Sequence, residues 1–160
     1  MQMVGDSLST ERSAGLLLFR QSNGGLEVLL AHPGGPYWRR KDDAAWTIPK
    51  GEVGLGEADA TAARREFAEE IGYDPPGDLL PLGEARQPGG KSVAIFAARG
   101  EWQPQHLLSN HFELEWPPRS GQLQSFPEVD RAAWFSIGEA KRKILKGQLV
   151  FLDRLVETLR

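Results

Sequence analysis

Three glutamates lie on one side of a helix that the sequence predicts over residues 58–71. At about 100° per residue, Glu66, Glu69 and Glu70 fall within an arc of roughly 100°. Like charges at these spacings repel, and the helix dipole disfavours anions near a helix C-terminus. A bound divalent cation would remove that cost, and carboxylate ligands without cysteine favour Mg²⁺ or Mn²⁺ over zinc. The alternative is a solvated acidic surface in which Arg65 pairs with Glu69.

A glycine-rich loop precedes this helix. Glycine permits tight turns and lets the main chain come close to a ligand. Loop and helix together read Gly51, five residues, Glu57, seven residues, and then Arg65-Glu66-Phe67-Ala68-Glu69-Glu70-Ile71-Gly72-Tyr73. This pattern resembles the Nudix box at every specified position. The one soft departure is Phe67, where an aliphatic residue is commoner.

The resemblance implies a fold and an activity. Nudix proteins are α/β/α sandwiches with a central mixed sheet and a catalytic loop–helix–loop, and they hydrolyse a nucleoside diphosphate linked to another moiety with Mg²⁺, or Mn²⁺ as a substitute. The metal ligands that the matching positions imply are the Gly51 carbonyl, Glu66, Glu69 and Glu70. Arg65 would orient these glutamates, and Glu57 would fix the loop against the helix through a salt bridge, expected with Arg65.

A later carboxylate is expected to complete the site. Glu128 lies in a proline-containing segment six residues before Trp134. Some Nudix proteins supply an auxiliary metal ligand or a general base from that place, and we predict such a role for Glu128, with an ordinary loop carboxylate as the alternative. In the implied reaction, metal ions neutralise the pyrophosphate and acidify the attacking water, whose proton a glutamate accepts.

Basic and aromatic residues before the box are candidates for substrate binding. Lys50 could reach a phosphate, or it could be an ordinary surface lysine. Arg39, Arg40 and Lys41 could clamp further phosphates while Trp38 stacks on a base. The alternative is a solvated loop whose aromatic side chains pack on the core. The stretch Trp46-Thr47-Ile48-Pro49-Lys50-Gly51-Glu52 resembles the asymmetric dinucleoside tetraphosphatase branch of the family.

These residues need a scaffold to position them. Apolar runs bounded by turn residues predict strands over 13–20, 26–31, 45–48, 79–85, 92–99, 110–116 and 132–136. Helices are expected over 58–71, 137–146 and 148–159, and residues 117–127 are expected to form a loop that contains proline and glycine. This order predicts an α/β fold with helices packed on a mixed sheet. Residues 13–160 would form a single domain after a flexible N-terminus, residues 1–12.

Composition excludes several classes of protein. The chain has 160 residues, a formal net charge of −3 and no cysteine. A protein that coats nucleic acids would be basic, and disulfide scaffolds, thiol nucleophiles and iron–sulfur clusters all need cysteine. No apolar run is long enough to span a bilayer, and the N-terminus lacks the pattern of a secretory signal, so we expect a cytoplasmic protein without a membrane partner. Monomer and homodimer both stay open.

The leading hypothesis is a Mg²⁺-dependent pyrophosphohydrolase of a small nucleotide, either a dinucleoside polyphosphate or a nucleoside triphosphate. Alternatives are an ADP-sugar pyrophosphatase and an enzyme that removes pyrophosphate from RNA 5′ ends; the acidic composition disfavours the RNA reading, while the basic loop 39–41 keeps it open. A nucleotide-binding sensor on a Nudix scaffold is the alternative outside the enzymes. The intact cluster of Glu66, Glu69 and Glu70 argues against the sensor, because a pure binder does not need it.

Overall fold

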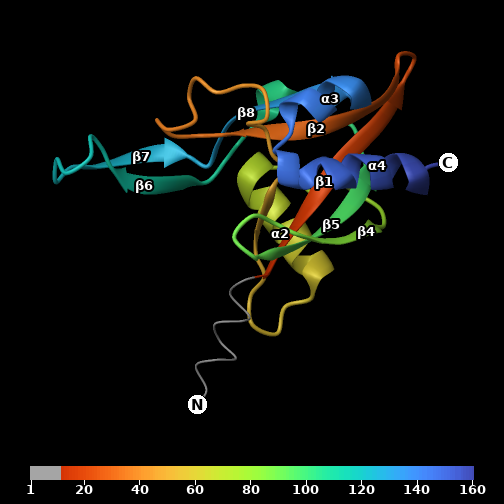
Figure 1. Cartoon of the computed structure of the whole chain (residues 1–160), viewed down its shortest axis with the longest axis horizontal. Helices are drawn as coiled ribbons and strands as arrows, with labels where there is room; N and C mark the ends of the chain where they lie inside the picture. Colours follow the sequence, from red (N-terminus) through yellow and green to blue (C-terminus); the bar gives the residue numbers. More distant parts are fainter. Residues whose placement is uncertain (1–11) are drawn as a thin grey trace.

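The computed structural model describes residues 12–160, and its centre is a six-stranded mixed sheet (Figure 1). The strand order is β4-β5-β1-β2-β8, with β3 paired to β1. Strands β1 and β5 are parallel, and the other pairs are antiparallel. The strands of this sheet are β1 (Arg12–Ser22), β2 (Gly25–Pro33), β3 (Lys50–Glu52), β4 (Leu80–Arg86), β5 (Ser92–Arg99) and β8 (Val129–Ser136).

Helices cover both faces of this sheet. The α-helices are α2 (Asp59–Ile71), α3 (Ile137–Lys143) and α4 (Leu149–Thr158), and the 3₁₀ turns are η1 (Pro104–His106) and η2 (Lys146–Gln148). Side chains alternate along β1, so that Leu16 and Leu18 pack in the core under α2, while Leu17 and Phe19 pack in the core under α3 and α4. Burial on both faces explains the uninterrupted apolar run of β1 and confirms the expected α/β/α sandwich.

Helix α2 forms where its apolar spacing predicts it. Phe67 and Ile71 are fully buried against the sheet, with Ala62 and Ala63 beside them. Gly72 ends the helix in the left-handed region, at a φ of 86°. A Cβ at Gly72 would also lie 2.8 Å from the main-chain oxygen of Leu108, so both the backbone conformation and the space require glycine here.

A second, two-stranded sheet stands away from the sandwich, at the left of Figure 1. It consists of β6 (His111–Glu115) and β7 (Leu123–Pro127), and Phe112 pairs with Phe126 across it. The expectation of a loop over 117–127 was therefore wrong for its second half. Proline fits the last position of β7, where the chain leaves the strand pair.

A further expectation differs from the structure. Residues 45–48 do not form a strand; Trp46 and Thr47 instead make isolated bridges to Ile144 and Ala31. The expected flexible segment 1–12 lies outside the described residues except for Arg12, which is the first residue of β1. Among residues 12–160, no helix has the length and apolar character needed to cross a bilayer.

Candidate active site

Gly51 brings the main chain of β3 against the side of α2. Strand β3 pairs with β1, and Gly51 lies opposite Ala14. A Cβ on Gly51 would overlap the carboxylate of Glu66, so only glycine leaves room for that side chain. The structure therefore places two of the expected ligand residues, which are 15 positions apart in the sequence, in direct contact.

Arg65 joins the loop to the helix. Its Nε and Nη2 donate to the two carboxylate oxygens of Glu57 at 2.9 and 3.0 Å, and Nη2 also donates to the Glu52 carbonyl at 2.9 Å. Its Nη1 lies 2.8 Å from Glu66 and 3.4 Å from Glu69. The bonds from Arg65, aided by the Gly54 amide, lower the pKa of Glu57 to about 2. Glu57 is thus held ionised as the anchor of the loop.

Glu70 lies where a negative charge is disfavoured. Burial, together with the nearby charges of Glu66 and Glu128, raises its pKa to about 8, although Lys50 acts in the opposite direction through its charge and its backbone N–H. Burial also raises the pKa of Glu66, although Arg65 opposes this. The charges of Glu66 and Glu128 therefore lie close enough to Glu70 to act on it, and Lys50 offsets them only in part.

This donor set fits a divalent cation. All its atoms are oxygens, and the carboxylates outnumber the cations near them. Within residues 12–160, no three His, Cys, Asp or Glu side chains already converge tightly enough to hold a metal ion. Binding therefore requires side-chain rotation. Glu69 has room for it, because its side chain is 41% exposed and its contact with Arg65 is a long one.

Glu128 is tied to the end of α2 by main-chain hydrogen bonds. The Asn110 amide donates to the Glu69 carbonyl at 2.9 Å, and the Glu128 amide donates to the Asn110 carbonyl at 2.7 Å. The amide of Gly34 in turn donates to the Glu128 carbonyl at 2.9 Å. The last carbonyls of a helix have no partner within the helix, and here the 108–110 segment supplies one. The exposed Glu128 is thereby held beside the glutamates of α2.

The candidate substrate-binding residues divide into two groups. Lys50 acts electrostatically on Glu70 and so belongs to the glutamate site. Arg39, Arg40 and Lys41 are exposed, and in the described part of the chain no carboxylate forms an ion pair with them. The Lys41 ammonium lies 5.1 Å from the ring centre of Trp38, which packs partly against the core under α3 and α4. Among the residues that the structure describes, no hydrogen bond or ion pair joins this basic loop to the glutamates of α2.

A cavity of about 410 Å³ lies between the 33–38 loop and β6. Glu128 lines it, as do Tyr37, Trp38, Phe112 and Leu114. Phe112 and Leu114 were not among the expected site residues. Their alternation in the sequence signals a strand, but only the packing of the hairpin on the loop places them here.

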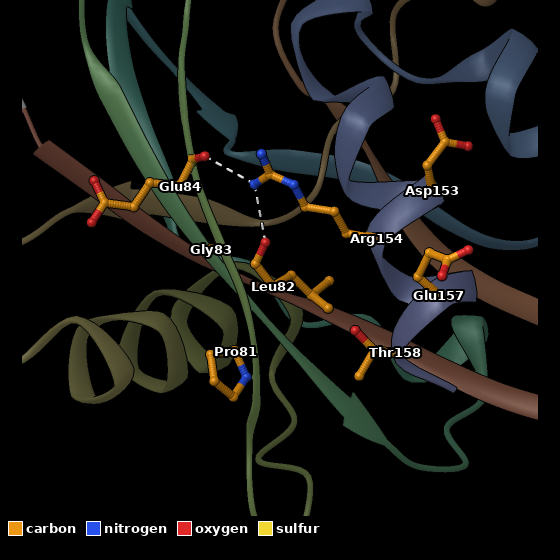
Figure 2. Close-up of a pocket in the computed structure, with 8 residues that line it drawn as sticks. All are labelled: Pro81, Leu82, Gly83, Glu84, Asp153, Arg154, Glu157 and Thr158. Carbon is orange, nitrogen blue, oxygen red and sulfur yellow. Dashed lines mark hydrogen bonds between the residues drawn. The ribbon is translucent and has the colours of Figure 1, made fainter. Parts of the chain in front are cut away.

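A second cavity, of about 490 Å³, lies between β4 and α4 and contains none of the site residues (Figure 2). Arg154 crosses it and donates to the carbonyls of Leu82 and Glu84 at 3.1 and 2.9 Å. These bonds satisfy main-chain groups beside an irregularity in the β4–β5 pairing. Arg154 therefore binds main-chain groups at this edge of the sheet, which accounts for its position by structure alone.

Comparisons with known proteins agree with this geometry. The NUDIX domain model matches residues 9–155. A C. elegans Ap4A hydrolase, solved as a binary complex, is 25% identical with a TM-score of 0.61 over 92% of this chain and 97% of that one. The NUDIX domain of Shewanella oneidensis NrtR with ADP ribose shares the fold at 16% identity, with a TM-score of 0.63 over 93% and 88% of the two chains. No curated protein matches the sequence.

Proposed function

Since the chain belongs to the Nudix family and is a pyrophosphohydrolase acting on phosphoanhydrides, we propose that it cleaves a dinucleoside polyphosphate or a nucleoside triphosphate with Mg²⁺. The observation that carries this proposal is the placement of Gly51 against the Glu66 carboxylate, with Arg65 bound to both Glu66 and Glu69 and with Glu70 beside Lys50. Nudix hydrolases generally need divalent metal ions. Mg²⁺ suits a site made only of oxygen ligands, with Mn²⁺ as a substitute.

The proposed metal ligands come from the loop and the helix. They are the Gly51 carbonyl, Glu66, Glu69 and Glu70, with Glu128 as an auxiliary ligand. Arg65 contacts Glu66 and Glu69, and its bonds to Glu57 would keep it anchored to the loop if those two glutamates bound a cation. When bound, the metal supplies charge neutralisation for the pyrophosphate and activation of the attacking water.

Proton transfer in this scheme falls to Glu128. It lies next to the glutamates of α2 and also lines the open cavity, so water can reach its carboxylate. As general base it accepts the proton of the attacking water, and the two products each leave with a terminal phosphate. Lys50, which acts on Glu70 in the absence of substrate, offers its ammonium to a substrate phosphate.

Two observations favour a substrate with several phosphates. The C. elegans protein that matches nearly its full length to this chain is an Ap4A hydrolase. In addition, Arg39, Arg40 and Lys41 are exposed cations without ion-pair partners in the described chain, and they follow directly on the aromatic loop. A short polyphosphate chain reaching from the glutamates to this loop would meet Lys50 and the proposed cation at one end and the basic residues of the loop at the other.

The test is a substrate panel run in ¹⁸O water with mass-spectrometric identification of products. The panel contains dinucleoside polyphosphates, nucleoside triphosphates, ADP-ribose and a 5′-triphosphorylated RNA, each with Mg²⁺, Mn²⁺ or EDTA. We expect cleavage of a small nucleotide that Mg²⁺ supports and EDTA abolishes, with ¹⁸O in one phosphate product. Absence of turnover on every compound with both metals would overturn the proposal, and a preference for the RNA would replace the substrate class.

A further inference from the structure

The aromatic cavity beside Glu128 has two walls from distant parts of the chain. The 33–38 loop contributes Tyr37 and Trp38, and β6 contributes Phe112 and Leu114. At the rim, the rings of Tyr37 and Trp116 meet edge to face, with centres 5.3 Å apart. The 59% exposure of Tyr37 leaves an aromatic ring open to solvent at the entrance.

Two glycines show that the two walls are fitted to each other. A Cβ on Gly34 would overlap the carbonyl oxygen of Pro127, and one on Gly35 would lie 3.1 Å from the Phe112 ring. Gly35 also has a φ of 98°, which L side chains rarely adopt. The hydrogen bond from the Gly34 amide to the Glu128 carbonyl closes the contact. Loop and hairpin therefore form one built pocket rather than a gap between two independent segments.

The lining of this pocket selects for a flat, apolar ring attached to an anionic chain. Aromatic side chains supply faces for stacking, and a cavity of about 410 Å³ has room for a heterocycle with its sugar. The neighbouring cations Arg39, Arg40 and Lys41 favour a ligand whose other part is negative. Glu128 belongs to both the pocket and the glutamate cluster, so the two sites are adjacent.

We propose that the cavity between the 33–38 loop and the β6–β7 hairpin binds the nucleobase of the substrate. This inference rests on the proposed function, because it assigns the part of the substrate that lies next to the reacting phosphates. The hairpin is then the element that makes the enzyme prefer nucleotides over phosphate compounds without a base.

Binding of non-hydrolysable probes tests the pocket separately from catalysis. We would titrate the wild-type protein with AMP, GMP, CMP, UMP and ribose 5-phosphate, none of which contains a phosphoanhydride, and follow tryptophan fluorescence and calorimetry. At least one nucleotide should bind about tenfold more tightly than ribose 5-phosphate and change the fluorescence, because one base stacked on aromatic rings contributes this much. Equal affinity for all five compounds would overturn the proposal.

Variants locate the binding in the cavity. Phe112→Ala should weaken nucleotide binding about tenfold and leave ribose 5-phosphate unchanged. The matched control is Phe126→Ala, which removes the cross-strand partner of Phe112 in the same hairpin but no lining side chain. Because Phe112→Ala could unfold the hairpin, the exposed Tyr37 provides a second variant, and Tyr37→Ala should weaken nucleotides about threefold or more. Unchanged nucleotide affinity in both variants would contradict the assignment.

The outcomes separate this inference from the proposed function. Base-dependent binding without turnover of any pyrophosphate would support the pocket and refute the enzyme's proposed substrates. Turnover of small nucleotides without base-dependent binding would support the proposed function and refute the nucleobase pocket.

Discussion

Carboxylates lie near both ends of helix α2, but hydrogen bonds from an arginine lower their pKa values only at its start. At its start, Arg12 donates to both Asp59 and Glu84, and these bonds lower the pKa of each carboxyl. Toward its end, Glu66 and Glu70 are half-buried one helical turn apart, and both have raised pKa values. The first arrangement stabilises the fold, whereas the second costs stability unless a cation binds. Such a local cost is expected where a protein keeps a functional site.

The largest effect should come from removing the carboxylate of Glu70, near the end of α2. We expect Glu70→Gln to lower kcat by about 10²-fold or more, because the amide cannot replace a carboxylate in holding the metal. The melting temperature without metal should stay equal or rise at pH 8, since the variant removes a buried charge. Steady-state kinetics and calorimetry on the same samples measure both. Turnover like that of the wild type would contradict the metal role of Glu70.

Gly51→Ala tests whether the contact between β3 and α2 matters for the same site. The added methyl group would overlap the Glu66 carboxylate and force it away from the main chain. We expect kcat to fall about tenfold or more, because small displacements of catalytic groups have effects of this order. Gly54→Ala is the matched control in the same loop, since its Cβ would meet only the Glu57 side chain, at 3.3 Å. Equal activity of the two variants would show that Gly51 is not a special position.

Metal binding should depend on pH in the direction set by Glu70. The pKa of Glu70 is about 8 in the folded protein, above the ordinary value of 4.5. Between pH 4.5 and pH 8 the folded state therefore holds a proton that the unfolded state has lost. Without metal, stability therefore falls as pH rises through this window. Below pH 8 a cation must displace the proton of Glu70. The apparent affinity for the cation should therefore weaken by up to about tenfold for each unit that the pH falls in this range.

Thermal unfolding with Mg²⁺ and with EDTA measures this effect. The rise in melting temperature caused by Mg²⁺ should be larger at pH 8.5 than at pH 6.5, and the difference should shrink in Glu70→Gln. A Mg²⁺ effect of the same size at both pH values in the wild type would mean that Glu70 does not compete for the ion.

The parts of this site that the sequence predicted are those set by neighbours along the chain. Helix α2 and its end at Gly72 follow from apolar spacing and one glycine, and the observed bounds differ from the expected ones by a single residue. The aromatic cavity was not predicted, because Phe112 reaches it only when the β6–β7 hairpin packs on the 33–38 loop. Strand β7 was missed for a related reason, since its polar and proline residues have little local preference for a strand. The proximity of Glu128 came from the family resemblance, because the main-chain links through Asn110 leave no trace in residue types.

The smallest effect should come from the start of α2, where a substitution should change stability and not activity. Arg12→Ala removes both ion pairs, and we expect a loss of about 1 kcal/mol, or roughly 2–4 °C in melting temperature, because the groups are partly exposed. Because the pKa values of Asp59 and Glu84 are lowered, the ion pairs stabilise the fold fully at a pH above the ordinary carboxyl pKa values. This stabilisation should be lost as the pH falls below about 4. Arg12→Lys, which keeps the charge, should lose less. A marked loss of kcat in Arg12→Ala with normal stability would mean that the two ends of the helix are coupled, and that the separation between them does not hold.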